Sequence, residues 1–140
     1  MDEIPVITLW QPWASWVIRG WKTVETRLHD RFFCLEGQWI GIHAGMKWDD
    51  NAMDAAMKYL TMDKRRETWN FRKDCGNLLG IAHVKYCGWL TGGVNDSMQA
   101  LIDCEHTKRY GIVFDRIQAF EPIPMKGKQG IWYISNKIKP

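Results

Sequence analysis

Runs of β-branched, aromatic and other apolar residues predict that most of the regular structure in this chain is β-strand. Such residues favour strands because their side chains pack well on a pleated surface. The longest run is bounded by Gly76-Asn77 and Gly92-Gly93, which are typical turn residues. The predicted strands cover residues 4–10, 23–27, 38–44, 78–89, 110–114, 117–120 and 131–135.

Apolar residues at helical spacing predict three shorter helices between the strands. Pro12 suits the first turn of a helix, which the 3.6-residue period continues to near Gly20. A stripe of alanine, methionine and leucine predicts a second helix over 49–60. An Asn-Asp pair can cap a third helix over about 95–103. The charged segment 63–73 either continues as a helix or forms a mobile loop.

The irregular order of helices and strands indicates the α+β class, because a doubly wound sheet needs regular alternation. The glycine within 38–44, Gly41, is typical of a bend in a small barrel. We therefore expect a small mixed β-barrel with helices packed around it. The 140 residues suffice for a single domain, 1–140, that buries a core without disulfides or metal. The tail 136–140 is expected to fray.

The composition is that of a globular protein, with 46% hydrophobic and 25% charged residues. No apolar run approaches the roughly 20 residues of a membrane-spanning helix, and the N-terminal residues lack the pattern of a signal peptide. We expect a cytoplasmic protein with no membrane partner. The net charge of +3 permits nucleic-acid binding without requiring it.

Nine tryptophans are unusual in a chain of this length. Their flat rings can stack on bases, but for any single tryptophan a place in the core is the favoured interpretation. Four cysteines lie far apart without a C-x-x-C pair, so we expect free thiols. Cys104, Glu105 and His106 include zinc-ligand types, but one cluster without a second ligand pair gives little support for a site. We expect no metal and no cofactor.

The most distinctive group of charges lies between residues 20 and 27. Glu25 and Arg27 are two residues apart in a predicted strand, so their side chains share a face, and Lys22 can join them from the preceding turn. Two cations beside one carboxylate keep it ionised and leave positive charge for a phosphate. An ordinary surface ion-pair strip is the alternative, and spacing alone favours it.

These motifs resemble the ASCH domain family. Residues 7–15, ITLWQPWAS, are followed by Gly20-x-Lys22-x-x-Glu25-x-Arg27, which is similar to the family signature G-x-K-x-x-E-x-R. Later segments resemble further blocks of the family in the same order, whereas 49–73 has no counterpart. The later segments are 41–44, 80–82, 110–114, 124–127 and Gly130. The resemblance implies a PUA-like β-barrel whose cleft is lined by the signature residues and binds RNA or nucleotides.

Each signature charge has a candidate role in such a cleft. Lys22 supplies a compact cation for a phosphate, or acts as a base if desolvation lowers its pKa. Arg27 suits a bidentate grip on phosphate, or orients Glu25. Glu25 accepts hydrogen bonds from the amino edge of a base, or acts as general acid and base on water. If the protein is an enzyme, Lys22 and Glu25 are the reacting pair.

Six further residues are binding candidates with structural alternatives. Gln11 pairs with a base edge and Trp13 stacks on a base, or both anchor the first helix. Thr23 supplies a hydroxyl beside the signature.

His43 faces the cleft or is satisfied at the barrel rim. Lys126 and Gly127, followed by Lys128, place cations beside backbone that can approach a phosphate closely, or form an ordinary surface turn.

The leading hypothesis is a domain that binds RNA, single-stranded nucleic acid or a modified nucleoside in this cleft. A small hydrolase is the alternative, because some ASCH proteins hydrolyse N4-acetylcytidine or cleave RNA. The threonine of the acetylcytidine hydrolases is expected three residues after the lysine, where this chain has Glu25, and this departure weakens that assignment. An interaction domain without a ligand in the cleft is a third hypothesis.

Overall fold

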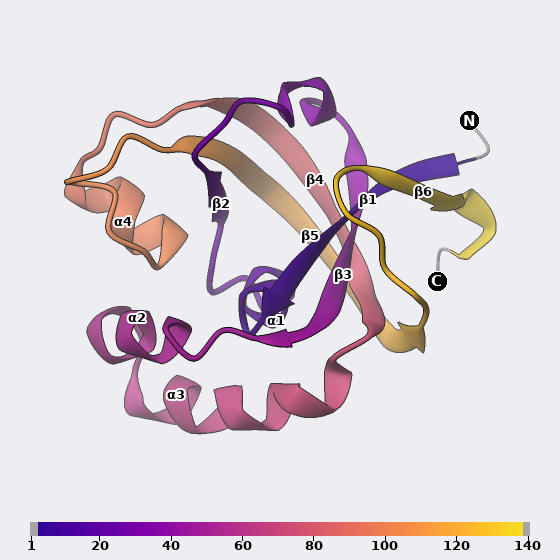
Figure 1. The fold of residues 1–140 in the computed structure, drawn as a ribbon, viewed down its shortest axis with the longest axis horizontal. Helices are drawn as coiled ribbons and strands as arrows, with labels where there is room; N and C mark the ends of the chain where they lie inside the picture. Colours follow the sequence, from indigo (N-terminus) through magenta and orange to yellow (C-terminus); the bar gives the residue numbers. More distant parts are fainter. Residues whose placement is uncertain (1–2, 139–140) are drawn as a thin grey trace.

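The computed structural model describes residues 3–138, which form a six-stranded sheet with four α-helices packed around it (Figure 1). The strands are β1 (Glu3–Gln11), β2 (Val24–Arg27), β3 (Trp39–Trp48), β4 (Asn77–Trp89), β5 (Tyr110–Pro124) and β6 (Trp132–Ser135). The α-helices are α1 (Trp13–Ile18), α2 (Ala52–Tyr59), α3 (Met62–Thr68) and α4 (Val94–Ala100). Three 3₁₀ helices complete the list: η1 (Phe33–Leu35), η2 (Trp69–Asp74) and η3 (Asn136–Ile138). No helix among residues 3–138 is long and apolar enough to cross a membrane.

The sheet is mixed, curved and open (Figure 1). β1 and β3 are parallel, and the other neighbours are antiparallel, in the order β2-β5-β4-β3-β1-β6. Within 3–138 no pairing joins β2 to β6, so the sheet is not closed and the expected barrel is wrong. The expected α+β class is confirmed. Each edge strand has four residues. Short edge strands are a common way for an open sheet to limit its unpaired backbone groups.

Most predicted strands are confirmed, and the main difference lies in β5. The segments 110–114 and 117–120 were expected to be separate strands, but they belong to one strand of 15 residues. β4 pairs His83 with Arg116 and Val84 with Phe114, so Asp115 is an extra residue that the pairing skips. A bulge of this kind bends a strand without ending it, which the residue pattern does not reveal.

The helices also differ from expectation in their limits. The segment 63–73 is helical rather than a loop, because α3 leads directly into η2. α4 ends at Ala100, and Leu101 adopts the left-handed conformation (φ 55°) that often terminates helices. In the tail, 136–138 form η3, and 139–140 lie outside the described residues.

The main core lies between α1 and the curved sheet. Ala14 and Val17 of α1 pack with buried residues of β1, β3, β4 and β5, such as Ile42 and Ile112. Burial of apolar side chains of this size stabilises the fold by about 1.5–3 kcal/mol each. The turn after α1, which carries Lys22, lies beside α4, because the Thr23 N–H donates to the Gln99 carbonyl at 3.0 Å.

A second core attaches the segment 49–73 to α1. Trp16 is fully buried, and its indole N–H donates to Thr68 Oγ1 at 3.0 Å. The Thr68 hydroxyl donates in turn to the carbonyl of Lys64 at 2.8 Å. Phe71 packs against the same cluster. One buried side chain of α3 therefore satisfies the polar atom of the largest buried residue of α1.

We predict that Thr68→Val lowers the free energy of unfolding by about 1–3 kcal/mol, because valine keeps the shape but leaves the Trp16 N–H buried without an acceptor. Urea unfolding followed by far-UV circular dichroism measures the change. Thr107→Val, at an exposed threonine, is the control and should change stability by less than about 0.5 kcal/mol. Equal stability of the two variants would contradict the structural role of this hydrogen bond.

Candidate functional site

The turn after α1 and strand β2 bring the three signature charges into contact. The carboxylate of Glu25 lies 3.6 Å from Lys22 Nζ through Oε1 and 2.5 Å from Arg27 Nη1 through Oε2. Glu25 is 5% exposed, and the side chain of Arg27 is 29% exposed. A nearly buried carboxylate between two cations differs from the surface ion-pair strip that the spacing alone favours. The negative charge of Glu25 is compensated by a cation on each side.

Lys22 is the innermost of the three charges. It is 1% exposed, and its ammonium group donates to the carbonyl of Ala100 at the end of α4. The ammonium also lies 4.8 Å from the centre of the Trp13 ring. Burial lowers the pKa of Lys22 to about 8, although the neighbouring Glu25 carboxylate acts in the opposite direction. Lys22 therefore supports Glu25 from beneath and lines neither cavity described below.

Two neighbouring cavities open beside the signature. The larger has a volume of about 1040 Å³ and the smaller about 320 Å³, and Thr8, Trp10 and Arg27 line both. Because they share three lining residues, the two cavities adjoin each other, and Arg27 lies at their boundary. Glu25 lines the smaller cavity.

Positive charge dominates the larger cavity. Its lining includes five lysine or arginine residues and two histidines, and no aspartate or glutamate. The cations are Arg27, Arg31, Lys47, Lys126 and Lys128, and the histidines are His29 and His43. Walls of one charge sign concentrate the field within a cleft and attract ligands of the opposite sign.

The smaller cavity combines aromatic rings with two carboxylates. Trp10 and Trp13 line it together with Glu25 and Asp49. Asp49 is fixed by the indole N–H of Trp13, which donates to Oδ2 at 2.9 Å. Ionised carboxylates only accept hydrogen bonds, so this cavity favours a ligand group with N–H or O–H donors.

Gln11 and Thr23 lie away from both cavities, whereas Trp13 reaches the smaller one. Gln11 is fully buried, and its amide donates to Ser15 Oγ (2.7 Å) and to the Phe71 carbonyl (3.1 Å). Its Oε1 accepts from the backbone N–H of Ser15 at 3.0 Å. These contacts match the helix-anchoring alternative for Gln11. Thr23 lies just before β2. Its backbone N–H donates to the Gln99 carbonyl, and its carbonyl accepts from the Phe114 N–H.

His43 and the turn after β5 meet on one wall of the larger cavity. The His43 Nε2 lies 2.8 Å from the Met125 carbonyl, and the side chain is 2% exposed. A Cβ atom on Gly127 would lie 2.6 Å from His43 Cε1, so only glycine allows this turn to approach the ring so closely. Lys126 is exposed beside it. The wall thus combines a buried, hydrogen-bonded histidine with an exposed cation.

Several lining residues were absent from the sequence-based prediction. Trp10 lies inside the block 7–15 that resembles the family motif, so its sequence position could have marked it as a site residue. Arg31, Lys47 and Asp49 lie outside the signature and join the site only through the fold. Lys128, in contrast, was expected beside the Lys126-Gly127 turn, and it lines the same cavity.

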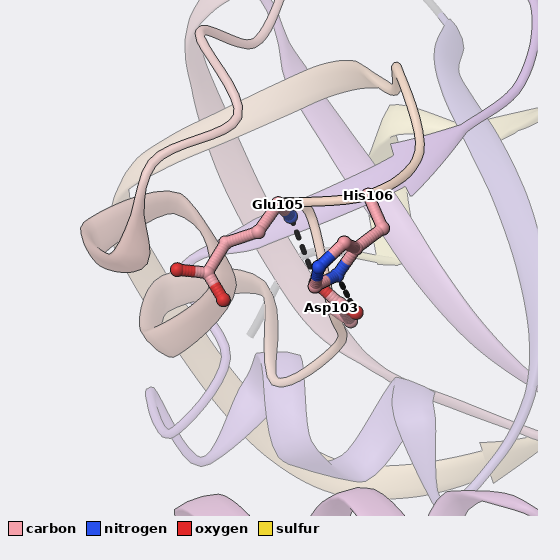
Figure 2. Close-up of side chains that lie close together, drawn as sticks. All are labelled: Asp103, Glu105 and His106. Carbon is pink, nitrogen blue, oxygen red and sulfur yellow. Dashed lines mark hydrogen bonds and ion pairs between the residues drawn. The ribbon is translucent and has the colours of Figure 1, made fainter.

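Asp103, Glu105 and His106 form an exposed cluster of metal-ligand types near α4 (Figure 2). His106 Nδ1 and Asp103 Oδ2 are 2.8 Å apart, and Asp103 Oδ1 accepts from the Glu105 N–H at 2.8 Å. One potential ligand atom from each of the three residues lies within 4.8 Å of the others. The hydrogen bond with His106 lowers the pKa of Asp103 and raises that of His106. Cys104, considered from the sequence, is buried instead. Hydrogen bonds within a surface turn account for the cluster.

Comparison with solved structures identifies the fold. The chain is similar to the crystal structure of the ASCH protein from Zymomonas mobilis, with 17% identity and a TM-score of 0.57 over 95% of this chain and 88% of that chain. Two single-substitution mutants of the same protein give 16% and 17% identity, TM-scores of 0.59 and 0.57, 95% coverage of this chain, and 89% and 91% of theirs. No family model and no curated protein matches the sequence.

We predict that the burial of Lys22 makes stability rise with pH. The pKa of Lys22 is about 8 in the folded protein and 10.5 in its ordinary state, so between these values the unfolded chain binds more protons than the folded one. The free energy of unfolding of the wild type, relative to Lys22→Met, should therefore increase by about 3 kcal/mol from pH 8 to pH 10.5. Urea unfolding across this range measures the difference.

Lys85→Met, which removes an exposed lysine, is the matched control and should show no such trend. A difference between wild type and Lys22→Met that stays constant with pH would show that Lys22 is not desolvated as described.

Proposed function

The chain has an ASCH-like fold, and from this premise we propose that its two adjoining cavities bind a nucleotide or single-stranded nucleic acid, in particular RNA or a modified base. The observation that carries the proposal is the lining of the larger cavity, with five cationic side chains and no acidic one. The RNA binding known for PUA-like domains is consistent with it.

The larger cavity suits phosphate groups. Arg27 gives one Nη atom to Glu25, and a guanidinium group has five N–H donors in total, so donors remain for an oxyanion. Lys126 and Lys128, on either side of Gly127 in the sequence, line the same cavity. Phosphate bound there would be contacted by both planar and point-like cations.

The smaller cavity suits a base. Trp10 is 48% exposed and offers a ring face for stacking. Glu25 and Asp49 provide acceptors for an exocyclic amino group or a ring N–H. Lys22 contributes indirectly, because its charge beneath Glu25 helps to keep that carboxylate ionised.

The hydrolase alternative depends on Lys22 and Glu25 acting together on a substrate. Glu25 lines a cavity, but Lys22 is enclosed by Trp13, Glu25 and the Ala100 carbonyl. A reacting group must come within hydrogen-bond reach of the atom on which it acts. The contacts of Lys22 thus favour binding over hydrolysis.

We predict that Arg27→Gln weakens the binding of a fluorescein-labelled single-stranded RNA and flattens its salt dependence. Each phosphate contact that is lost should reduce the slope of log K against log salt by about 0.7, because fewer counterions are released. Lys128→Ala removes another cation of the larger cavity. It should also weaken binding and flatten the salt dependence, without removing a partner of Glu25. Fluorescence anisotropy over a salt series measures both effects.

Arg116→Gln is the control for charge alone, because Arg116 is exposed and stacks on Trp39 away from both cavities. It should leave the slope unchanged. Equal effects of all three variants would indicate nonspecific attraction and contradict phosphate binding in the cleft.

We predict binding without turnover for N4-acetylcytidine and for single-stranded RNA. Incubation with each compound followed by mass spectrometry is the measurement. Turnover by the wild type that is lost in Lys22→Ala would overturn the binding proposal in favour of the hydrolase.

A further inference from the structure

A pair of stacked tryptophans lies outside the two cavities, one at the end of β3 and the other at the start of η2. The rings of Trp48 and Trp69 are 5.9 Å apart between centroids and inclined by only 16°. Trp69 is 51% exposed. Trp69 begins η2, within the segment 49–73 that has no counterpart among the sequence motifs. A half-exposed ring backed by a second ring is a rigid surface on which another flat group can stack.

Cationic side chains accompany this pair. The guanidinium of Arg72 lies 4.3 Å from the centre of the Trp48 ring and 5.8 Å from that of Trp69. Its ion pair with Asp50 spans 3.9 Å between side chains that are 54% and 91% exposed, so it is a weak restraint. Residues 61–74 contain five lysine or arginine residues against three acidic ones. This charge favours an anionic partner over a purely apolar one.

The Trp48 indole N–H also favours a ligand with hydrogen-bond acceptors. It is buried and has no hydrogen-bond partner among residues 3–138. A buried donor without an acceptor is unfavourable. An oxygen-rich ligand bound beside the weakly restrained Arg72 would supply the acceptor that this donor lacks.

The stacked pair is next to the cleft along the chain. Lys47 lines the larger cavity, and Trp48 is the next residue of β3. Gly76 also lines that cavity and lies two residues after η2 ends at Asp74. Figure 1 shows η2 leading into β4 at this end of the sheet. The backbone of Trp48 therefore adjoins a residue of the larger cavity, and a strand of several nucleotides is long enough to reach from the cleft to the tryptophans.

We infer that Trp48, Trp69 and Arg72 form a second stacking site for single-stranded nucleic acid whose other nucleotides lie in the cleft. This inference rests on the proposed function. A base stacks on the outer face of Trp69, Arg72 binds an adjacent phosphate, and the Trp48 N–H donates to a ligand oxygen. RNA and DNA share this chemistry.

The experiment compares ligands of different length. Fluorescence anisotropy with labelled RNA and DNA of about 12 nucleotides, a length within the range of single-strand sites, is set against calorimetric titration with cytidine monophosphate. Trp69→Ala should weaken binding of the long ligand about tenfold, the loss expected for one stacked base. It should leave binding of the mononucleotide unchanged. Trp69→Phe should restore most of the loss, because phenylalanine also stacks.

Trp89→Ala is the matched control, because Trp89 is 43% exposed, carries Lys108 at 5.0 Å from its ring and lines neither cavity. It should leave both affinities unchanged. Wild-type binding of both ligands without any effect of Trp69→Ala would overturn this inference alone. Failure of the wild type to bind any of them would overturn the proposed function as well. Dimerisation that depends on Trp69, seen by size-exclusion chromatography, would identify a second copy of this chain as the occupant. That result would overturn the stacking inference.

Discussion

The nearly buried carboxylate of Glu25 lies between Lys22 and Arg27, whose positive charges compensate its negative charge. The surrounding structure depends on these two ion pairs. Removing one partner of a buried ion pair costs about 3–5 kcal/mol, because it leaves a charge without compensation. The two cations differ in their surroundings. Lys22 is enclosed and bonded to the end of α4, whereas Arg27 is partly exposed in the cleft. One carboxylate thus connects the interior of the protein to its candidate binding surface.

The charges around this carboxylate are segregated. Acidic groups line the smaller cavity, where Glu25 and Asp49 accept hydrogen bonds, whereas the lysine and arginine side chains of the larger one face no acidic residue in its lining. Arg27 lies where the two meet. A nucleotide has the same division, with N–H donors on its base and negative charge on its phosphate. The arrangement therefore explains why a chain of only +3 net charge has a strongly cationic cleft.

The tryptophans serve different purposes according to their burial. Trp16 is fully buried and joins α1 to α3 through Thr68. Trp13 lies between the core and the smaller cavity, where it orients Asp49. Trp10 and Trp69 are about half exposed and each lies near a cation. The abundance of this residue type thus reflects both core packing and exposed aromatic surface.

The sequence by itself determined the α+β class, most strand positions and the short-range grouping of Lys22, Glu25 and Arg27, because these follow from local periodicity and spacing. Only the tertiary structure decided that the sheet is open, that Lys22 is buried, and that Gln11 anchors α1. It alone brought Arg31, Lys47 and Asp49 to the signature, since these residues are separated from it by loops and strands. Burial and long-range contacts depend on how distant segments pack, and local residue patterns carry no such information.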